Sequence, residues 1–321
     1  MKTDLTLSHP ARAVLAGALL ALLGASASAG GPPHIGARAD FSTATLVSEV
    51  SVPGFADGCP IESADGLSLL LASNRPGTTG GNDIWAADRA SLNEPWGMPR
   101  NLGAPINSPN ADFCPTPVYG RSLLFVSDRP GDGTGPTPCG GGDIYLSRQS
   151  PAGGWSPPVM LKCASEGGPN FPGAERSPSL VQTYVGTFLF YSSTGNGTQH
   201  DIYVSRMDRN GEFGPGKVVT ELSTEFDDLM PNVRERADGS FEIVFSSSRP
   251  TWGHGQAAFG GQDVYIARAW WPTGPWSEPR NLGEAVNTAG VEQRATLSKD
   301  GERMYFGRDG DIYMSTRSGR H

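Results

Sequence analysis

Acidic side chains recur along this chain at positions where carboxylates could hold a cation or cleave a glycosidic bond. Five of them stand three residues before a proline, or before an alanine in the last case: Asp57, Asp112, Glu175, Asp228 and Glu292. Facing one another without partners, these carboxylates would repel each other or recruit a cation. We favour a structural role, in which each accepts hydrogen bonds from backbone donors or from one of three later arginines (Arg75, Arg129, Arg249).

A Gly-Gly-Asn-Asp run at residues 80–83 is typical of a calcium-binding β-roll, which repeats its motif every nine residues. Here the aspartate recurs only about every sixty residues, in the motifs DIW at 83, DIY at 143, DIY at 201, DVY at 263 and DIY at 311. A short carboxylate at the start of a strand can instead accept hydrogen bonds from the preceding loop. We therefore predict a structural role for Asp83, with no metal and no cofactor.

The best candidates for ligand binding lie where the repeated units differ most. One long glycine-rich loop covers residues 131–142 and contains Asp132, and another covers residues 251–262. In the second loop, Trp252, His254 and Phe259 could stack on a sugar or grip a peptide, because loops on a rigid scaffold concentrate binding residues. The alternative is that Trp252 and Phe259 pack the loop onto its own repeat.

Signals for catalysis are weak. A glycoside hydrolase needs two carboxylates in different surroundings, and Asp132 and Asp227 are the acids that depart from the repeat. The sialidase motif Ser-x-Asp-x-Gly-x-Thr-Trp is half present, in SADG and SKDG. The sequence contains neither a phosphate-binding loop nor a serine nucleophile elbow. We predict no catalytic residue.

The elements that position these residues are short strands. Each of five repeats contains an acid-led strand, an apolar strand and the DIY strand, with tight turns such as ADG at 64–66, and the first four repeats add a fourth segment. With 43 glycines and 27 prolines among 321 residues, long helices are nearly excluded. Four-stranded units repeated in this way predict an all-β, five-bladed β-propeller.

The fifth repeat ends without its fourth strand, and residues 41–51 match the fourth strand at 213–223 in character. The N-terminal strand is therefore expected to complete the last blade and close the ring. A single domain is predicted over residues 40–318. Its blades are expected at about 57–107, 112–163, 175–223, 228–288 and 292–316.

The remaining composition indicates export. A charged start and an apolar run before Ala29 predict a signal peptide over residues 1–29, followed by a disordered linker at 30–39. Four cysteines then imply two disulfides. Cys59 and Cys114 hold equivalent positions in adjacent repeats, whereas Cys139 and Cys163 flank one blade edge, which favours the pairs 59–114 and 139–163 among three alternatives. A net charge of −8 with no basic cluster excludes nucleic-acid binding, and no segment predicts membrane insertion.

The recurring pattern NLG…IN…(D/E)xxP…DG…S.RP…GGxDIY resembles the WD40-like repeat of TolB-type propellers, in the form found beside OmpA-like domains of envelope proteins. This resemblance implies a binding scaffold of the envelope, periplasmic or secreted. We therefore expect a monomeric, non-catalytic protein that binds an envelope protein or glycan through its glycine-rich loop face. The alternative is a glycan-cleaving hydrolase that uses carboxylates at the mouth of the central channel.

Overall fold

The computed structural model describes residues 31–33, 41–119, 121–130, 137–195, 197–252 and 255–317, apart from the side chain of Trp252. The expected signal peptide lies outside the described residues, as does most of the expected linker. The described chain from Pro32 onwards forms one compact unit. No described helix is long and apolar enough to cross a membrane.

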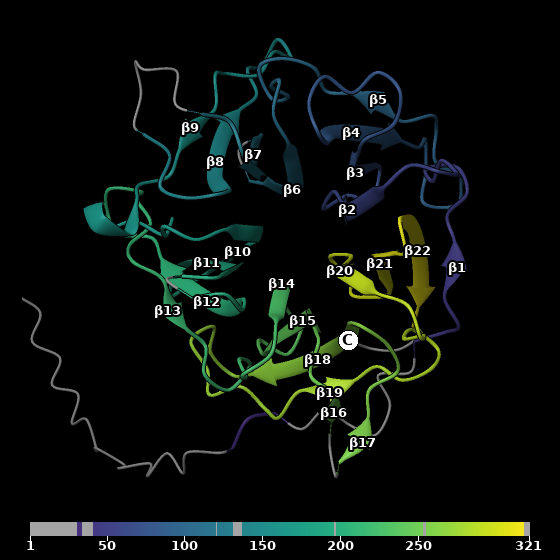
Figure 1. Cartoon of the computed structure of the whole chain (residues 1–321), viewed down its shortest axis with the longest axis vertical. Helices are drawn as coiled ribbons and strands as arrows, with labels where there is room; N and C mark the ends of the chain where they lie inside the picture. The colour runs from purple at the N-terminus through teal and green to yellow at the C-terminus, as the bar shows by residue number, and fades with distance from the viewer. Residues whose placement is uncertain are drawn as a thin grey trace, which may run out of the picture. The chain divides into compact units, whose positions relative to one another are not determined.

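Within this unit, five four-stranded antiparallel sheets stand around a central axis, as the prediction of a five-bladed propeller requires (Figure 1). The innermost strands, which line the axis, are β2 (Asp57–Glu62), β6 (Asp112–Val118), β10 (Glu175–Thr183), β14 (Asp228–Glu235) and β20 (Glu292–Leu297). The second strands are β3 (Ser68–Ser73), β7 (Ser122–Ser127), β11 (Gly186–Ser193), β15 (Phe241–Ser247) and β21 (Arg303–Arg308).

The third strands begin with the repeated aspartate, and the fourth strands are only two residues long. The third strands are β4 (Asp83–Asp88), β8 (Asp143–Arg148), β12 (Asp201–Arg206), β18 (Asp263–Ala269) and β22 (Asp311–Thr316). The fourth strands are β5 (Arg100–Asn101), β9 (Val159–Met160), β13 (Lys217–Val218), β19 (Arg280–Asn281) and β1 (Thr45–Leu46). A hairpin of β16 (Thr251–Trp252) and β17 (Gln256–Ala257) extends from the fourth blade, and a 3-10 turn, η1 (Ala164–Glu166), follows the second.

The N-terminal strand closes the ring as predicted. Strand β1 pairs antiparallel with β22, with Thr45 opposite Met314 and Leu46 opposite Tyr313. Backbone hydrogen bonds from Ser42 to Thr316 and from Val47 to Ile312 continue this pairing beyond the two ladder residues. Joining the two ends of the described chain in one blade leaves no open seam between the first and last repeats.

Each innermost strand contains a β-bulge at its third residue, where the register with the second strand shifts. The bulged residues have φ between 49° and 57°; we call them the bulge ring: Cys59, Cys114, Ser177, Met230 and Arg294. In four blades the next residue is proline, which fits here because the ladder loses a hydrogen bond at a bulge and proline has no N–H to offer.

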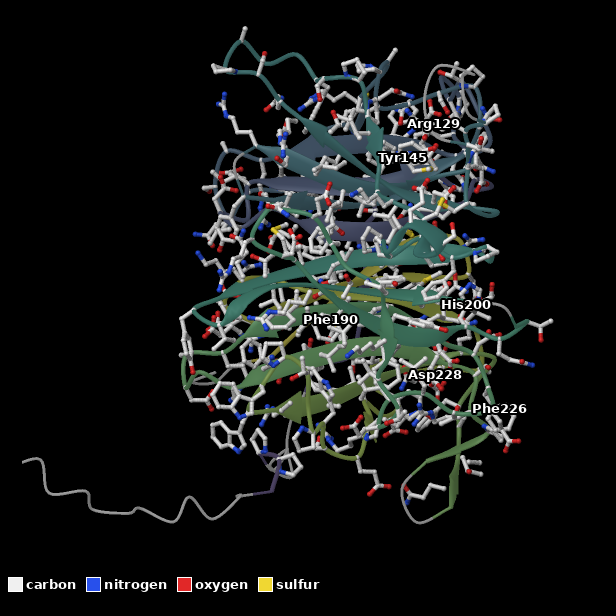
Figure 2. All side chains as sticks on the ribbon, turned by 90° about the vertical axis from the view of Figure 1, so that its left-hand side faces the viewer. Arg129, Tyr145, Phe190, His200, Phe226 and Asp228 are labelled. Atoms are coloured by element: carbon white, nitrogen blue, oxygen red, sulfur yellow. A yellow bond between two sulfur atoms is a disulfide. The ribbon has the colours of Figure 1, made fainter. Side chains whose placement is uncertain are left out.

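Packing between the blades is apolar and aromatic. The second and third strands pair aromatic rings, such as Phe125 with Tyr145 and Phe245 with Tyr265. An arginine after the second strand covers each of these two pairs, with Arg129 lying 5.1 Å from the Tyr145 ring and Arg249 lying 4.9 Å from the Tyr265 ring (Figure 2). The same arginines bind the repeated acids, so one side chain links the aromatic core of a blade to the channel.

The structure forms both predicted disulfides, Cys59–Cys114 and Cys139–Cys163. The first joins the innermost strands of two blades across the channel wall, because both cysteines belong to the bulge ring. The second joins the loop before β8 to the segment after β9, within one blade. Two disulfides indicate an oxidising compartment, extracellular or periplasmic.

Candidate functional site

A cavity of about 500 Å³ opens at the end of the propeller where the innermost strands begin. Its walls include Asp57, Phe113, Asp128, Arg176 and Asp309, and bulge-ring residues form its floor. Cys59, Cys114, Met230 and Arg294 of that ring line the cavity. The central channel therefore ends in a pocket of mixed polar and apolar lining, whose floor includes a disulfide, a thioether and a guanidinium.

The five repeated acids, which we call the acid ring, are buried at the first residue of each innermost strand. Four of them pair with an arginine of their own blade: Asp57 with Arg75 at 2.5 Å, Asp112 with Arg129 at 2.6 Å, Asp228 with Arg249 at 2.5 Å and Glu292 with Arg308 at 2.8 Å. Each of the five also accepts a hydrogen bond from a backbone N–H four or five residues earlier. The acid ring therefore fixes the start of each innermost strand and presents no open ring of carboxylates.

Glu175 is the exception within the acid ring, because its blade has Gly195 where three other blades have the arginine. Its Oε1 accepts hydrogen bonds from the Ser193 hydroxyl and the Phe171 N–H, whereas Oε2 has no partner among the described residues. Burial without a paired arginine raises the pKa of Glu175 to about 8, although the charge of nearby Arg176 opposes the rise. This carboxyl is therefore protonated at neutral pH.

The repeated aspartates of the third strands are also held by the backbone. Oδ2 of Asp83 accepts hydrogen bonds from the Thr79 N–H and the Asn101 amide at 2.8 and 2.7 Å. Asp263 makes the equivalent bonds with Phe259 and Asn281. Among the described residues, no cluster of three or more metal-ligating side chains occurs.

A third set of residues, the rim positions, lies just above the acid ring, one residue beyond each second strand: Asn74, Asp128, Thr194, Ser248 and Asp309. In four blades the rim side chain accepts a hydrogen bond from the N–H that precedes the acid, at 2.8 to 3.1 Å. No such bond joins Asp128 to the corresponding N–H of Ala111 in the described structure. Asp128 thus departs from the structural role of its counterparts.

The carboxylate of Asp128 lies beside Arg176, a residue of β10 in the next blade. A Cβ atom added at Gly142 would lie 2.7 Å from Nη1 of Arg176 and 3.1 Å from Oδ1 of Asp128, so only a glycine allows this approach. Although Asp128 is exposed to the cavity, partial burial of its carboxyl raises its pKa, and the charge on Arg176 opposes that rise. A carboxyl with a raised pKa can act as a general acid.

Asp309 supplies a second carboxylate to the same cavity from the fifth blade. It is exposed, and the Val291 N–H fixes its Oδ1 at 3.1 Å. No described arginine, lysine or histidine pairs with it. The cavity therefore holds two accessible carboxylates with different neighbours, since Asp128 lies beside a cation and Asp309 beside a backbone N–H.

Of the ligand-binding residues predicted from the sequence, Phe259 has a described side chain, and it does not line this cavity. Phe259 is 39% exposed on the loop before β18, away from the cavity lining. Trp252 belongs to β16, and His254 and Asp132 lie outside the described residues. The sequence reasoning missed Asp128 and Asp309, although a signal exists: both are acids at a repeat position where the other blades have Asn, Thr or Ser.

Comparisons with solved structures find the same fold in several glycoside hydrolases, at low sequence identity. An α-L-arabinofuranosidase from Lactobacillus brevis matches with a TM-score of 0.54 at 11% identity, over 85% of this chain and 94% of that one. An endo-arabinase from Bacteroides thetaiotaomicron matches with a TM-score of 0.54 at 14% identity, over 84% and 97%. A thermostable family-43 glycoside hydrolase matches with a TM-score of 0.51 at 14% identity, over 83% and 91%.

No protein-family model matches the sequence, and a search of curated proteins finds no match. The predicted kinship with TolB-type repeats is therefore wrong, since the similar structures are glycoside hydrolases. The expectation of a non-catalytic binding scaffold is corrected on the same ground. The physical reason is that the repeat motifs form the turns, bulges and buried acids of each blade. They therefore carry no information about what the cavity binds.

Proposed function

We propose that this protein is a glycan-cleaving hydrolase whose catalytic site is the central cavity. The observation that supports this proposal most strongly is that Asp128 and Asp309 line the same cavity. Glycoside hydrolysis requires two carboxylates in different environments. The likeness to arabinose-releasing enzymes concerns the fold, and it makes pentose-containing glycans the first substrates to test.

In this proposal, Asp128 donates a proton to the glycosidic oxygen. Because its pKa is raised, the Asp128 carboxyl keeps its proton at a higher pH than an ordinary aspartate does. In this proposal Arg176 orients the carboxyl. Asp309 acts at the anomeric carbon, either as the base that activates the attacking water or as the nucleophile that forms a glycosyl-enzyme, which water then hydrolyses. Phe113 and Met230 supply apolar surface for a sugar ring, as ligand cavities commonly do.

The test is hydrolysis of a panel that contains an aryl α-L-arabinofuranoside and linear arabinan, followed by reducing-sugar release. Wild-type protein should cleave at least one member. Asp128→Asn and Asp309→Asn should each lower kcat by about 100-fold or more, since each removes one half of the acid–base pair. Glu278→Gln is the matched control and should keep the wild-type rate. Glu278 is an exposed acid just before β19, outside the cavity lining.

The pH profile separates the two roles. If Asp128 is the acid, wild-type activity falls as pH rises through its raised pKa, and Asp128→Asn flattens this alkaline limb. Full activity in both aspartate variants, with unchanged melting temperatures, would exclude the cavity as the catalytic site. The expected envelope ligand and the monomeric state stay predictions.

A further inference from the structure

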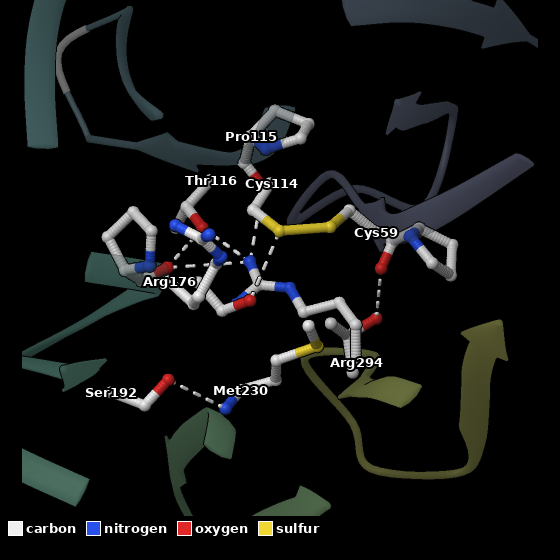
Figure 3. The surroundings of a disulfide bond; sticks show 12 residues. Cys59, Cys114, Pro115, Thr116, Arg176, Ser192, Met230 and Arg294 are labelled. Atoms are coloured by element: carbon white, nitrogen blue, oxygen red, sulfur yellow. Dashed lines mark hydrogen bonds between the residues drawn. A yellow bond between two sulfur atoms is a disulfide. The ribbon is translucent and has the colours of Figure 1, made fainter. Parts of the chain in front are cut away.

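Arg294 of β20 is the largest fully buried side chain of the described protein, and it lies at the floor of the cavity. Its guanidinium extends beside the Cys59–Cys114 disulfide (Figure 3). Nη2 donates to the Thr116 hydroxyl at 2.9 Å and more weakly to the carbonyls of Pro115 and Pro178. Nε and Nη1 have no hydrogen-bond partner among the described residues.

No described carboxylate pairs with this cation. Burial lowers the pKa of Arg294 to about 9, and no neighbouring charge opposes that shift, so the group stays charged at neutral pH without compensation. A buried charge with unsatisfied donors strongly destabilises a fold unless something neutralises it. The other buried arginines of the described residues each pair with a carboxylate: Arg75, Arg234, Arg268 and Arg317.

The comparison between blades shows that the fold does not require this charge. The equivalent bulge positions hold Cys, Cys, Ser and Met with the same left-handed backbone. Arginine is thus a departure from the repeat, as Asp128 is. A second cation, Arg176, lines the same cavity, whereas the acids Asp128 and Asp309 stand higher, at the rim.

We propose that the cavity floor is an anion site, in which the free Nε and Nη1 of Arg294 bind a small oxyanion such as a carboxylate or sulfate. The fork of a guanidinium fits two oxygens of such a group. The anion could be the carboxylate of an acidic sugar within the glycan, an extension that rests on the proposed function. It could equally be a free inorganic anion with the same chemistry.

The experiment follows the melting temperature of the full mature chain against sodium sulfate, galacturonate and galactose. Wild-type protein should show a saturable rise with sulfate, of about 5 °C at concentrations about 100-fold above the dissociation constant. Arg294→Met should lose the saturable rise, while its melting temperature without anion stays equal or increases, because a buried uncompensated charge is gone. Arg209→Met removes an exposed cation in the turn after β12 and should behave as wild type.

A saturable effect of galacturonate, absent with galactose, assigns the site to an acidic sugar; sulfate alone assigns it to inorganic anions. Arg294→Lys keeps the charge but not the fork, and should bind about tenfold more weakly, which provides a second test if the methionine variant folds poorly. A wild-type response to sulfate no different from that of Arg294→Met would overturn the proposal. Because the readout is a melting temperature, failure of glycan hydrolysis leaves this result interpretable.

Discussion

The acid ring and the bulge ring lie two residues apart on the same five strands, and they differ in what the five blades share. In the acid ring the blades share the side chain: each has a buried carboxylate that accepts hydrogen bonds at the start of its innermost strand. In the bulge ring the backbone is repeated while the side chains differ. A residue that every blade keeps serves the blade; a residue that one blade changes is free to serve the cavity.

The same comparison separates the rim positions. Four rim side chains accept a hydrogen bond from the N–H before the acid. Asp128 instead lies beside Arg176 of the next blade. Asp309 combines both behaviours, since one oxygen keeps the structural bond while the residue still lines the cavity. The residues that depart from the repeat, Asp128 among the rim positions and Arg294 in the bulge ring, thus line a single cavity.

Breaking the acid ring should have the largest effect on stability. Asp228→Ala removes a buried carboxylate and leaves the half-buried Arg249 without its partner, and it should lower the free energy of unfolding by about 3–5 kcal/mol. Urea denaturation at pH 7 measures this loss. The double variant Asp228→Ala/Arg249→Met should recover part of it, and equal losses in the single and double variants would show that the ion pair is not the cause.

Breaking the bulge ring at its disulfide should cost less. Replacing Cys59 and Cys114 by alanine frees a closed segment of 55 residues in the unfolded chain, and we expect a loss of about 2–4 kcal/mol. The matched variant without Cys139 and Cys163 frees only 24 residues and should lose less. A reversed order, measured by denaturation under identical conditions, would contradict this account.

A pH-dependent effect distinguishes Glu175 from the other acids of its ring. In the unfolded chain this carboxyl loses its proton near pH 4.5, whereas in the folded protein it keeps the proton up to about pH 8. Its contribution to stability is therefore complete below pH 4.5 and is lost as pH rises towards 8. Glu175→Gln should be nearly neutral at pH 5 and relatively stabilising at pH 8.

Unfolding free energies at pH 5, 6.5 and 8 test this prediction. The difference between wild type and Glu175→Gln should grow with pH in favour of the variant. Parallel pH curves for the two proteins would show that Glu175 titrates at an ordinary pKa and that the missing arginine has no electrostatic consequence.

The sequence by itself determined the fold, because each blade is a local unit whose turns, bulge prolines and apolar strands are readable within about sixty residues. The disulfide pairing followed for the same reason, since Cys59 and Cys114 hold equivalent repeat positions in adjacent blades. Local patterns also identified the repeated acids and their arginines in three blades, although the blade with Glu175 lacks that partner.

The candidate site was decided only by the tertiary structure. Asp128, Arg176, Arg294 and Asp309 come from four segments up to 181 positions apart, from Asp128 to Asp309, and no short-range pattern joins them. The ring brings them to one cavity, where burial alters the chemistry of a carboxyl and leaves a guanidinium without a partner. The sequence predicted ligand binding in long glycine-rich loops, whereas the cavity is lined by strands and strand ends that the repeat holds in place.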